Sequence, residues 1–269
     1  MFRFALTPMK PLAVAMWLVG GPLGFCLGGA EPVATANPAQ VHTFVIAFVG
    51  GFVHRDDARH PEVKLIQRLQ ADYPEKIVSR VFENRRNREA YELIRRQLDQ
   101  NHDGSLSESE KESARIMLVG HSWGAFEVVS LARRLQRDGI PVLLTAQVDS
   151  VAKIGRNDSL IPANVQQAVN FYQTRGWIHG RAKITAADPS RTRILGNFQL
   201  SYREPPAECK AYPWYDLFFT RSHTEIECDP DVWSRIESLV RDQLTDRPAQ
   251  KTSVFSISPI VSAGRKVTR

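Results

Sequence analysis

The chain has 269 residues, of which 43% are hydrophobic and 24% are charged, and its formal net charge is +6. This length allows one sizeable hydrophobic core, and the composition excludes a wholly disordered chain. The charge lies at the ends, because residues 1–30 carry +2 and residues 246–269 carry +4, which leaves the middle neutral. We therefore do not expect the domain to bind nucleic acid.

The first 30 residues are typical of an export signal. The short basic segment MFRFALTPMK precedes an uncharged apolar stretch, and Gly28, Gly29 and Ala30 are small enough for a signal peptidase. We expect residues 1–30 to be a signal peptide and the mature protein to be periplasmic or secreted. The alternative is an uncleaved N-terminal membrane anchor, since a stretch of this length can span a bilayer.

From residue 42 onward, buried strands alternate with amphipathic helices. Continuous apolar runs predict strands at 42–52, 76–84, 114–120, 140–150 and 166–173. Helical spacing of apolar residues predicts helices at 61–73, 87–99, 124–139 and 229–244. This alternation predicts an α/β fold with a mostly parallel sheet and helices on both faces, in three layers.

The predicted α/β domain covers residues 31–245, and residues 246–269 are expected to be a loose basic tail. Within the domain, the segment 176–216 is long and rich in aromatic residues, so we expect it to form a lid or a pocket wall. The sequence leaves the oligomeric state and any association with a membrane open.

Ser122 lies in the sequence GHSWG at 120–124, between the strand RIMLV and the helix AFEVVSLARRL. A tight strand-to-helix turn crowds the positions two before and two after the serine, where Gly120 and Gly124 avoid a Cβ collision. This arrangement resembles the nucleophile elbow of the α/β-hydrolase superfamily. The resemblance implies a serine nucleophile, a histidine base and an orienting carboxylate, in the chain order serine, acid, histidine.

Two residues of this chain fit the remaining roles that the resemblance implies. Asp149 lies at the end of the strand that follows the predicted helix after Ser122. It is the predicted orienting acid, with Asp158 and Asp188 as alternatives. His223 precedes the last strong helix, which is where the superfamily places its base.

The same resemblance implies an oxyanion hole made of backbone N–H groups. One is expected from Trp123, directly after the nucleophile. The other is expected from Gly51 or Phe52, in the glycine-containing loop after the first strand.

Removal of residues 1–30 leaves two cysteines, Cys209 and Cys228. An even number of cysteines in an exported protein favours one disulfide, with two buried free thiols as the alternative.

Residues 99–110, DQNHDGSLSESE, resemble the calcium loop of EF-hand proteins. Oxygen-bearing residues recur at the required spacing, and Gly104 stands where the loop must turn sharply. The resemblance implies these calcium ligands: Asp99, Asn101, Asp103, Ser105, Ser107 and Glu110. We expect calcium to have a structural role and catalysis to need no cofactor; an acidic surface loop is the alternative reading.

These features predict an exported serine hydrolase that cleaves a carboxylic ester or thioester of a small molecule or lipid. An amidase or peptidase uses the same three residues. A non-catalytic binding protein on the same fold is the alternative from another functional class.

Overall fold

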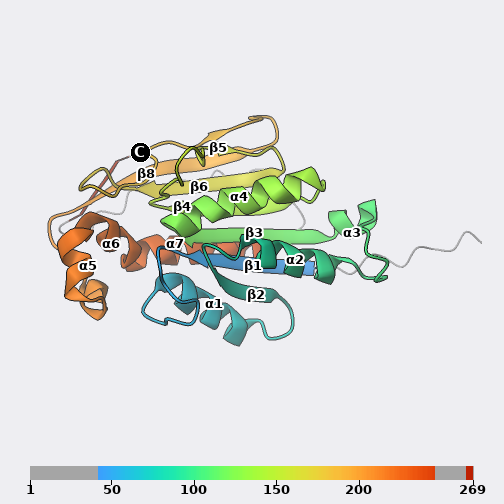
Figure 1. Cartoon of the computed structure of the whole chain (residues 1–269), viewed down its shortest axis with the longest axis horizontal. Coiled ribbons are helices and arrows are strands. Elements are labelled where there is room, and N and C mark those ends of the chain that lie inside the picture. Colours follow the sequence, from blue (N-terminus) through green and yellow to red (C-terminus); the bar gives the residue numbers. More distant parts are fainter. Residues whose placement is uncertain (1–41, 246–264, 269) are drawn as a thin grey trace, which may run out of the picture. The chain divides into compact units, whose positions relative to one another are not determined.

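The computed structural model describes residues 42–245 and 265–268, so the expected signal peptide and most of the tail lie outside the described residues. A seven-stranded sheet has the order β2-β1-β3-β4-β6-β8-β9 (Figure 1). Six strands are parallel and β9 is antiparallel to β8. The strands are β1 (His42–Val49), β2 (Val78–Glu83), β3 (Ala114–His121), β4 (Val142–Val148), β6 (Val165–Tyr172), β8 (Arg193–Tyr202) and β9 (Arg265–Thr268).

Helices connect the strands, and a two-stranded sheet forms outside the main one. The small sheet pairs β5 (Leu160–Ile161) with β7 (Thr185–Ala186). The helices are α1 (Pro61–Asp72), α2 (Asn87–Leu98), α3 (Glu108–Glu112), α4 (Trp123–Arg137), the 3-10 helix η1 (Ala207–Ala211), α5 (Trp214–Phe219), α6 (Arg221–Glu227) and α7 (Pro230–Leu244).

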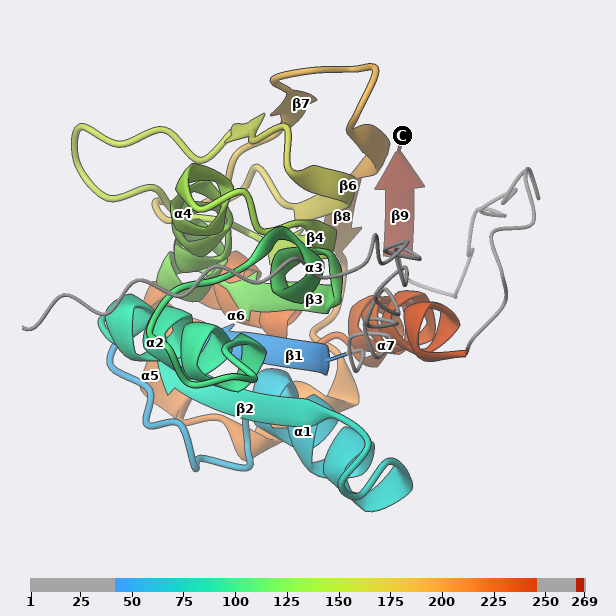
Figure 2. The ribbon, with the colours of Figure 1, turned by 90° about the vertical axis from the view of Figure 1, so that its right-hand side faces the viewer.

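Each face of the main sheet is covered by its own helices. Alternate side chains of β1 point to opposite faces, so Phe44, Ile46 and Phe48 join a core with α2 and α4. Val45 and Ala47 join a second core with α1 and α7. Figure 2 shows the two pairs of helices on opposite sides of the strands. The prediction of a three-layered α/β fold with a mostly parallel sheet is therefore confirmed.

Local sequence signals set the ends of two helices beside the site. The side chain of Asp229 accepts a hydrogen bond from the backbone N–H of Asp231 at 2.9 Å, and Pro230 occupies the first position of α7. Gly139 follows α4 at a φ of 75°, a conformation that glycine adopts without steric cost.

The structure differs from expectation in two segments. The segment 176–216 contains β8, which lies between β6 and β9 in the sheet, so much of it is neither lid nor pocket wall. Most of β8 is only half-buried, which hides the apolar run that marks the other strands. Four residues of the tail form β9, so the tail is not loose throughout.

Over the described residues, no helix is both long and apolar enough to cross a membrane.

Candidate active site

Ser122 lies at the carboxyl edge of the sheet, directly between β3 and α4. Its backbone has φ 56° and ψ −126°, which is a costly conformation for a residue other than glycine. The peptide N–H of Ser122 donates to the carbonyl of Val148 at 2.9 Å, and its own carbonyl accepts from Val151 at 3.3 Å. The turn is thus held in its strained form by the end of the neighbouring strand β4.

Glycines make this turn sterically feasible. A Cβ on Gly120 would lie 2.7 Å from the carbonyl carbon of Gly124, and one on Gly124 would lie 2.2 Å from the Phe48 oxygen. A Cβ on Gly50 would lie 2.9 Å from the Cβ of Ser122. The crowding predicted for Gly120 and Gly124 is present, and Gly50 adds a contact that sequence reasoning did not single out.

Asp149 and His223 meet beside this turn. Asp149 follows β4, is fully buried, and its Oδ2 lies 2.6 Å from Nδ1 of His223 on α6. Three further donors bind the carboxylate: the backbone N–H and the side-chain Nε2 of Gln173, at 3.2 and 2.8 Å, and the N–H of Gly180 at 2.7 Å. The carboxylate therefore has a fixed orientation toward the histidine.

Two contacts bring Ser122 and His223 into the same region. The ring of His121, the residue before the serine, lies 4.5 Å from the ring of His223 between centroids. Ser122 also donates a hydrogen bond to Val148, the residue that directly precedes Asp149, so the serine and the aspartate lie close together. The structure places no hydrogen bond between the Ser122 hydroxyl and His223, two described residues that are both more than nine-tenths buried.

The two alternative acids and the other downstream histidine lie elsewhere. Asp158 is buried against the hydroxyl of Ser150 and the guanidinium of Arg181, whereas Asp188 binds Ser190 at the surface. His179 contacts the neighbouring carbonyl of Gly180 at 3.5 Å. Of the three candidate acids, Asp149 alone contacts His223.

The residues expected to form the oxyanion hole lie next to each other. Phe52 belongs to a turn in which Val53 donates to Gly50, and its ring packs edge-on against the ring of Trp123 at 5.8 Å. Trp123 is the first residue of α4. Within the described ranges, the backbone N–H groups of Phe52 and Trp123 have no hydrogen-bond partner. Both donors are thus available for an anion, and Trp123 lies at the positive end of the α4 dipole.

Buried ionisable groups lie behind the serine. The Nδ1 atom of His121 is 3.5 Å from Oε1 of Glu227, the last residue of α6. Burial lowers the pKa of His121, which favours the neutral ring. Burial alone would raise the pKa of Glu227, but the ring nitrogens of His121 and His60 that face its carboxylate hold that pKa well below its usual range. The ring of His121 therefore contacts both the charged carboxylate of Glu227 and the ring of His223.

The expected disulfide is present and adjoins α6. Cys209 of η1 is bonded to Cys228, with the two Cα atoms 5.3 Å apart. Because Cys228 directly follows Glu227, the bridge ties the C-terminal end of the helix that carries His223 to η1. His223 itself lies within α6, the helix directly before α7.

The 99–110 loop connects α2 to the short helix α3. Gly104 has a φ of 82°, and the Asp99 carboxylate accepts from the backbone N–H groups of Asp103 and Gly104. The Glu110 carboxylate accepts from the N–H groups of Gln100 and Ser107. The acidic side chains of the loop are not among the described groups of three or more His, Cys, Asp or Glu that gather within 4.8 Å. Calcium binding therefore stays a prediction.

Sequence reasoning missed the residues that hold Asp149. Gln173 and Gly180 lie in the loop after β6, 24 and 31 residues from the aspartate in the chain. A Cβ on Gly180 would lie 2.4 Å from the carbonyl carbon of Asp149, so glycine is required by close approach. In the sequence, both residues are marked only by their position after β6, a strand that ends at the same edge of the sheet as β4.

No family model and no curated protein matches the chain. Solved structures with some likeness include one from Xanthomonas campestris pv. campestris assigned to the α/β superfamily of hydrolases (11% identity, 75% of this chain, 99% of that chain, TM-score 0.37). Another is an uncharacterised Pseudomonas aeruginosa protein (10% identity, 77% of this chain, 51% of that chain, TM-score 0.40), of which this chain spans about half. A third is the RedJ thioesterase of prodiginine biosynthesis in Streptomyces coelicolor (12% identity, 72% and 96%, TM-score 0.33). Likenesses this low carry no information on the site, so its function has to be read from its own residues.

Proposed function

We propose that the chain is a serine hydrolase that cleaves a carboxylic ester or thioester through Ser122, His223 and Asp149. One observation carries the proposal: a fully buried Asp149 binds His223 at 2.6 Å, beside a strained strand-to-helix turn that presents a serine. A non-catalytic domain has no evident need for the strain, the buried carboxylate and the aligned imidazole together.

The proposed reaction begins with proton transfer from the Ser122 hydroxyl to Nε2 of His223. The serine oxygen attacks the acyl carbon, and the carbonyl π electrons move to the oxygen, which becomes an oxyanion. Asp149 keeps the proton on Nδ1 and stabilises the imidazolium that forms. His223 then returns its proton to the leaving alcohol or thiol as the acyl bond to it breaks.

Two features support stabilisation of the oxyanion. The backbone N–H groups of Phe52 and Trp123 have no described hydrogen-bond partner, the rings of the two residues are in contact, and α4 begins at Trp123. Donors already oriented before the reaction require no reorganisation when the charge develops. Water, deprotonated by His223, then attacks the acyl-enzyme and releases the acid and Ser122.

The proposed substrate is an apolar ester of a small molecule or lipid. Phe52 is 86% exposed beside Trp123, so the entrance to the site offers aromatic surface. An acyl or alcohol chain that covers this surface would gain hydrophobic binding free energy. No nucleic-acid partner is proposed.

A fluorophosphonate probe tests the proposal, because it reacts with an activated serine and not with an ordinary one. We expect one probe per chain, located at Ser122 by mass spectrometry of the labelled peptide. Ser122→Ala should abolish labelling and hydrolysis of p-nitrophenyl esters, and His223→Gln should reduce both strongly.

Ser130→Ala is a matched control, since this serine lies on α4 away from the turn. An unlabelled, folded wild-type chain would contradict the proposal and favour a binding protein on this fold. Comparison of esters of increasing acyl length with the matching thioesters and amides would identify the substrate class.

A further inference from the structure

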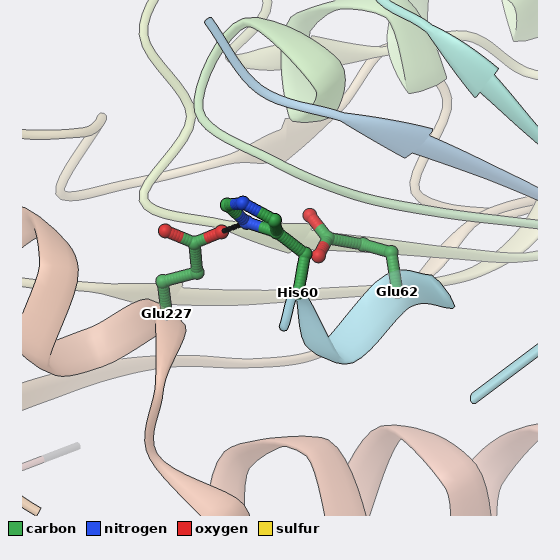
Figure 3. Close-up of side chains that lie close together, drawn as sticks. All are labelled: His60, Glu62 and Glu227. Atoms are coloured by element: carbon green, nitrogen blue, oxygen red, sulfur yellow. Dashed lines mark hydrogen bonds and ion pairs between the residues drawn. The ribbon is translucent and has the colours of Figure 1, made fainter. Parts of the chain in front are cut away.

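The proposed hydrolysis leaves three buried side chains unused: His60, Glu62 and Glu227. His60 and Glu62 lie at the start of α1, and Glu227 ends α6, 167 residues from His60 along the chain. One ligand atom from each side chain lies within 4.8 Å of the other two. Figure 3 shows the ring of His60 between the two carboxylates. We call these residues the His60 cluster.

Among the three residues, Glu62 is the one whose side chain makes no hydrogen bond. The residue is fully buried, and neither carboxylate oxygen has a hydrogen-bond partner within the described part of the chain. Glu227 and His60 by contrast pair with each other, with Oε1 2.5 Å from Nδ1. A buried carboxylate without a hydrogen-bond donor either takes up a proton or binds a cation, so Glu62 is free to become a ligand when a cation is present.

We propose that His60, Glu62 and Glu227 bind one divalent transition-metal ion of the Zn²⁺ class. A dication balances the two carboxylates, while the neutral imidazole adds the nitrogen ligand that such ions favour. The same donor set disfavours calcium and magnesium, because both ions prefer oxygen ligands to an imidazole nitrogen. On binding, the ion displaces the hydrogen-bonded proton between His60 and Glu227, whose ligand atoms move apart from 2.5 Å to about 3.4 Å, and it also binds an oxygen of Glu62.

The cluster is held in place from both sides. Pro61 separates the two α1 ligands and fixes the backbone between them. The carbonyl of Glu227 accepts a 2.6 Å hydrogen bond from the indole N–H of Trp233, and the next residue, Cys228, is in the disulfide. Ligands with restricted backbones lose little entropy when they bind a metal ion.

A route to solvent and a place for further coordination are both present. Three protein ligands leave a fourth tetrahedral position for water. The ring of Tyr212 packs edge-on against His60 at 5.2 Å, and its buried hydroxyl has no hydrogen-bond partner in the described residues. Tyr212 also lines an open cleft of about 320 Å³, together with Pro61 and Cys228. Pro61 lies between two of the ligands and Cys228 follows the third, so the cluster lies directly behind the wall of this cleft.

An ion at this position would join α1 to α6, the helix that carries His223. Its role would be to hold the two helices together behind the serine, with no contact to the substrate. Binding of the ion does not depend on the proposed hydrolase activity.

The test measures metal binding directly. The purified chain is freed of metal with a chelator and titrated with zinc chloride by calorimetry, and with cobalt chloride by visible absorption. We expect one ion per chain and a Co²⁺ spectrum typical of nitrogen and oxygen ligands. Glu62→Gln, which keeps the side-chain shape, should weaken binding by about tenfold or more.

Glu227→Gln replaces a second ligand and should weaken binding in the same way, so the result does not depend on a single substitution. Circular dichroism checks that both variants fold. Glu208→Gln, in the same cleft but outside the cluster, and Glu110→Gln, in the 99–110 loop, should bind as the wild type does. Absence of stoichiometric binding by the wild type, or undiminished binding by Glu62→Gln and Glu227→Gln, would overturn the proposal.

Discussion

At the scale of single residues, Asp149 has the most specific surroundings in the candidate site. Its φ of 43° is unusual for a residue other than glycine, and its carboxylate receives four hydrogen bonds in a fully buried position. Those bonds offset the cost of removing the charge from water. Gln173 contributes two of the four donors, so it positions the carboxylate for His223 without any contact to the reacting atoms.

Gln173→Ala tests this positioning role. The substitution removes the Nε2 donor but keeps the backbone N–H, so Asp149 loses the hydrogen bond to the oxygen that also binds His223. A hydrogen bond to a charged group contributes about 1.5–3 kcal/mol, and we expect the rate constant for fluorophosphonate labelling to fall about tenfold or more. Gln166→Ala, at an exposed position on the preceding strand β6, should label at the wild-type rate. Equal rates for both variants would contradict the role.

His42, at the start of β1, makes stability depend on pH. Burial lowers its pKa below the ordinary value of 6.5, and its Nε2 atom is buried without a described partner. As the pH falls below 6.5, the unfolded chain takes up a proton that the folded chain does not, so this residue's contribution destabilises the fold. Above the unfolded pKa the two states bind equally few protons, and the effect disappears.

His42→Gln should therefore lose less stability than the wild type between about pH 7.5 and about pH 5.5. Urea unfolding at the two pH values measures the difference, which isolates His42 from the other histidines. Parallel losses in the two proteins would show that the folded ring protonates normally.

At the scale of elements, the strand-turn-helix around Ser122 shows which features sequence alone can predict. β3 is a continuous apolar run and α4 has a clear helical spacing, so the turn between them has defined ends. The glycines at 120 and 124 then follow from local crowding. The 99–110 loop has an equally clear pattern, but whether its oxygens bind calcium depends on an ion and not on the fold of the chain.

A calcium titration tests that loop. Helix α3 begins with a capping box formed by Ser107 and Glu110, so Glu110 already orients the second half of the loop. We expect calcium to raise the melting temperature, with a stabilisation of about 2.7 kcal/mol at a hundred times Kd. Glu110→Gln should abolish the shift while keeping a residue that suits the cap. Glu108→Gln, which alters a neighbouring exposed carboxylate, should retain it. If neither calcium nor a chelator changes the melting temperature of the wild type, residues 99–110 are an acidic surface loop and not a calcium site.

At the scale of the whole molecule, the sequence predicts more of the architecture than of the network that supports the site. The α/β class and the serine turn follow from periodicity and local crowding. Gln173 and Gly180 approach Asp149 only because β6 lies beside β4, and local pattern does not reveal that neighbour relation. Glu62 and Glu227 meet for the same kind of reason, across two helices that are far apart in the chain. β8 lacks the continuous apolar run of the other strands, although Phe198, Leu200 and Tyr202 alternate along one buried face.

β9 completes the sheet and offers a test at this scale. It pairs with β8 from Gln199↔Thr268 to Tyr202↔Arg265 and so covers an edge that otherwise has free backbone donors and acceptors. Deleting residues 265–269 should lower the free energy of unfolding by about 1–2 kcal/mol, since a few backbone hydrogen bonds are lost. The exposed edge should also promote self-association, which size-exclusion chromatography detects. Because the candidate site lies at β3 and β4, labelling of Ser122 should be unchanged. A truncated chain as stable and monodisperse as the full one would show that β9 adds nothing to the sheet.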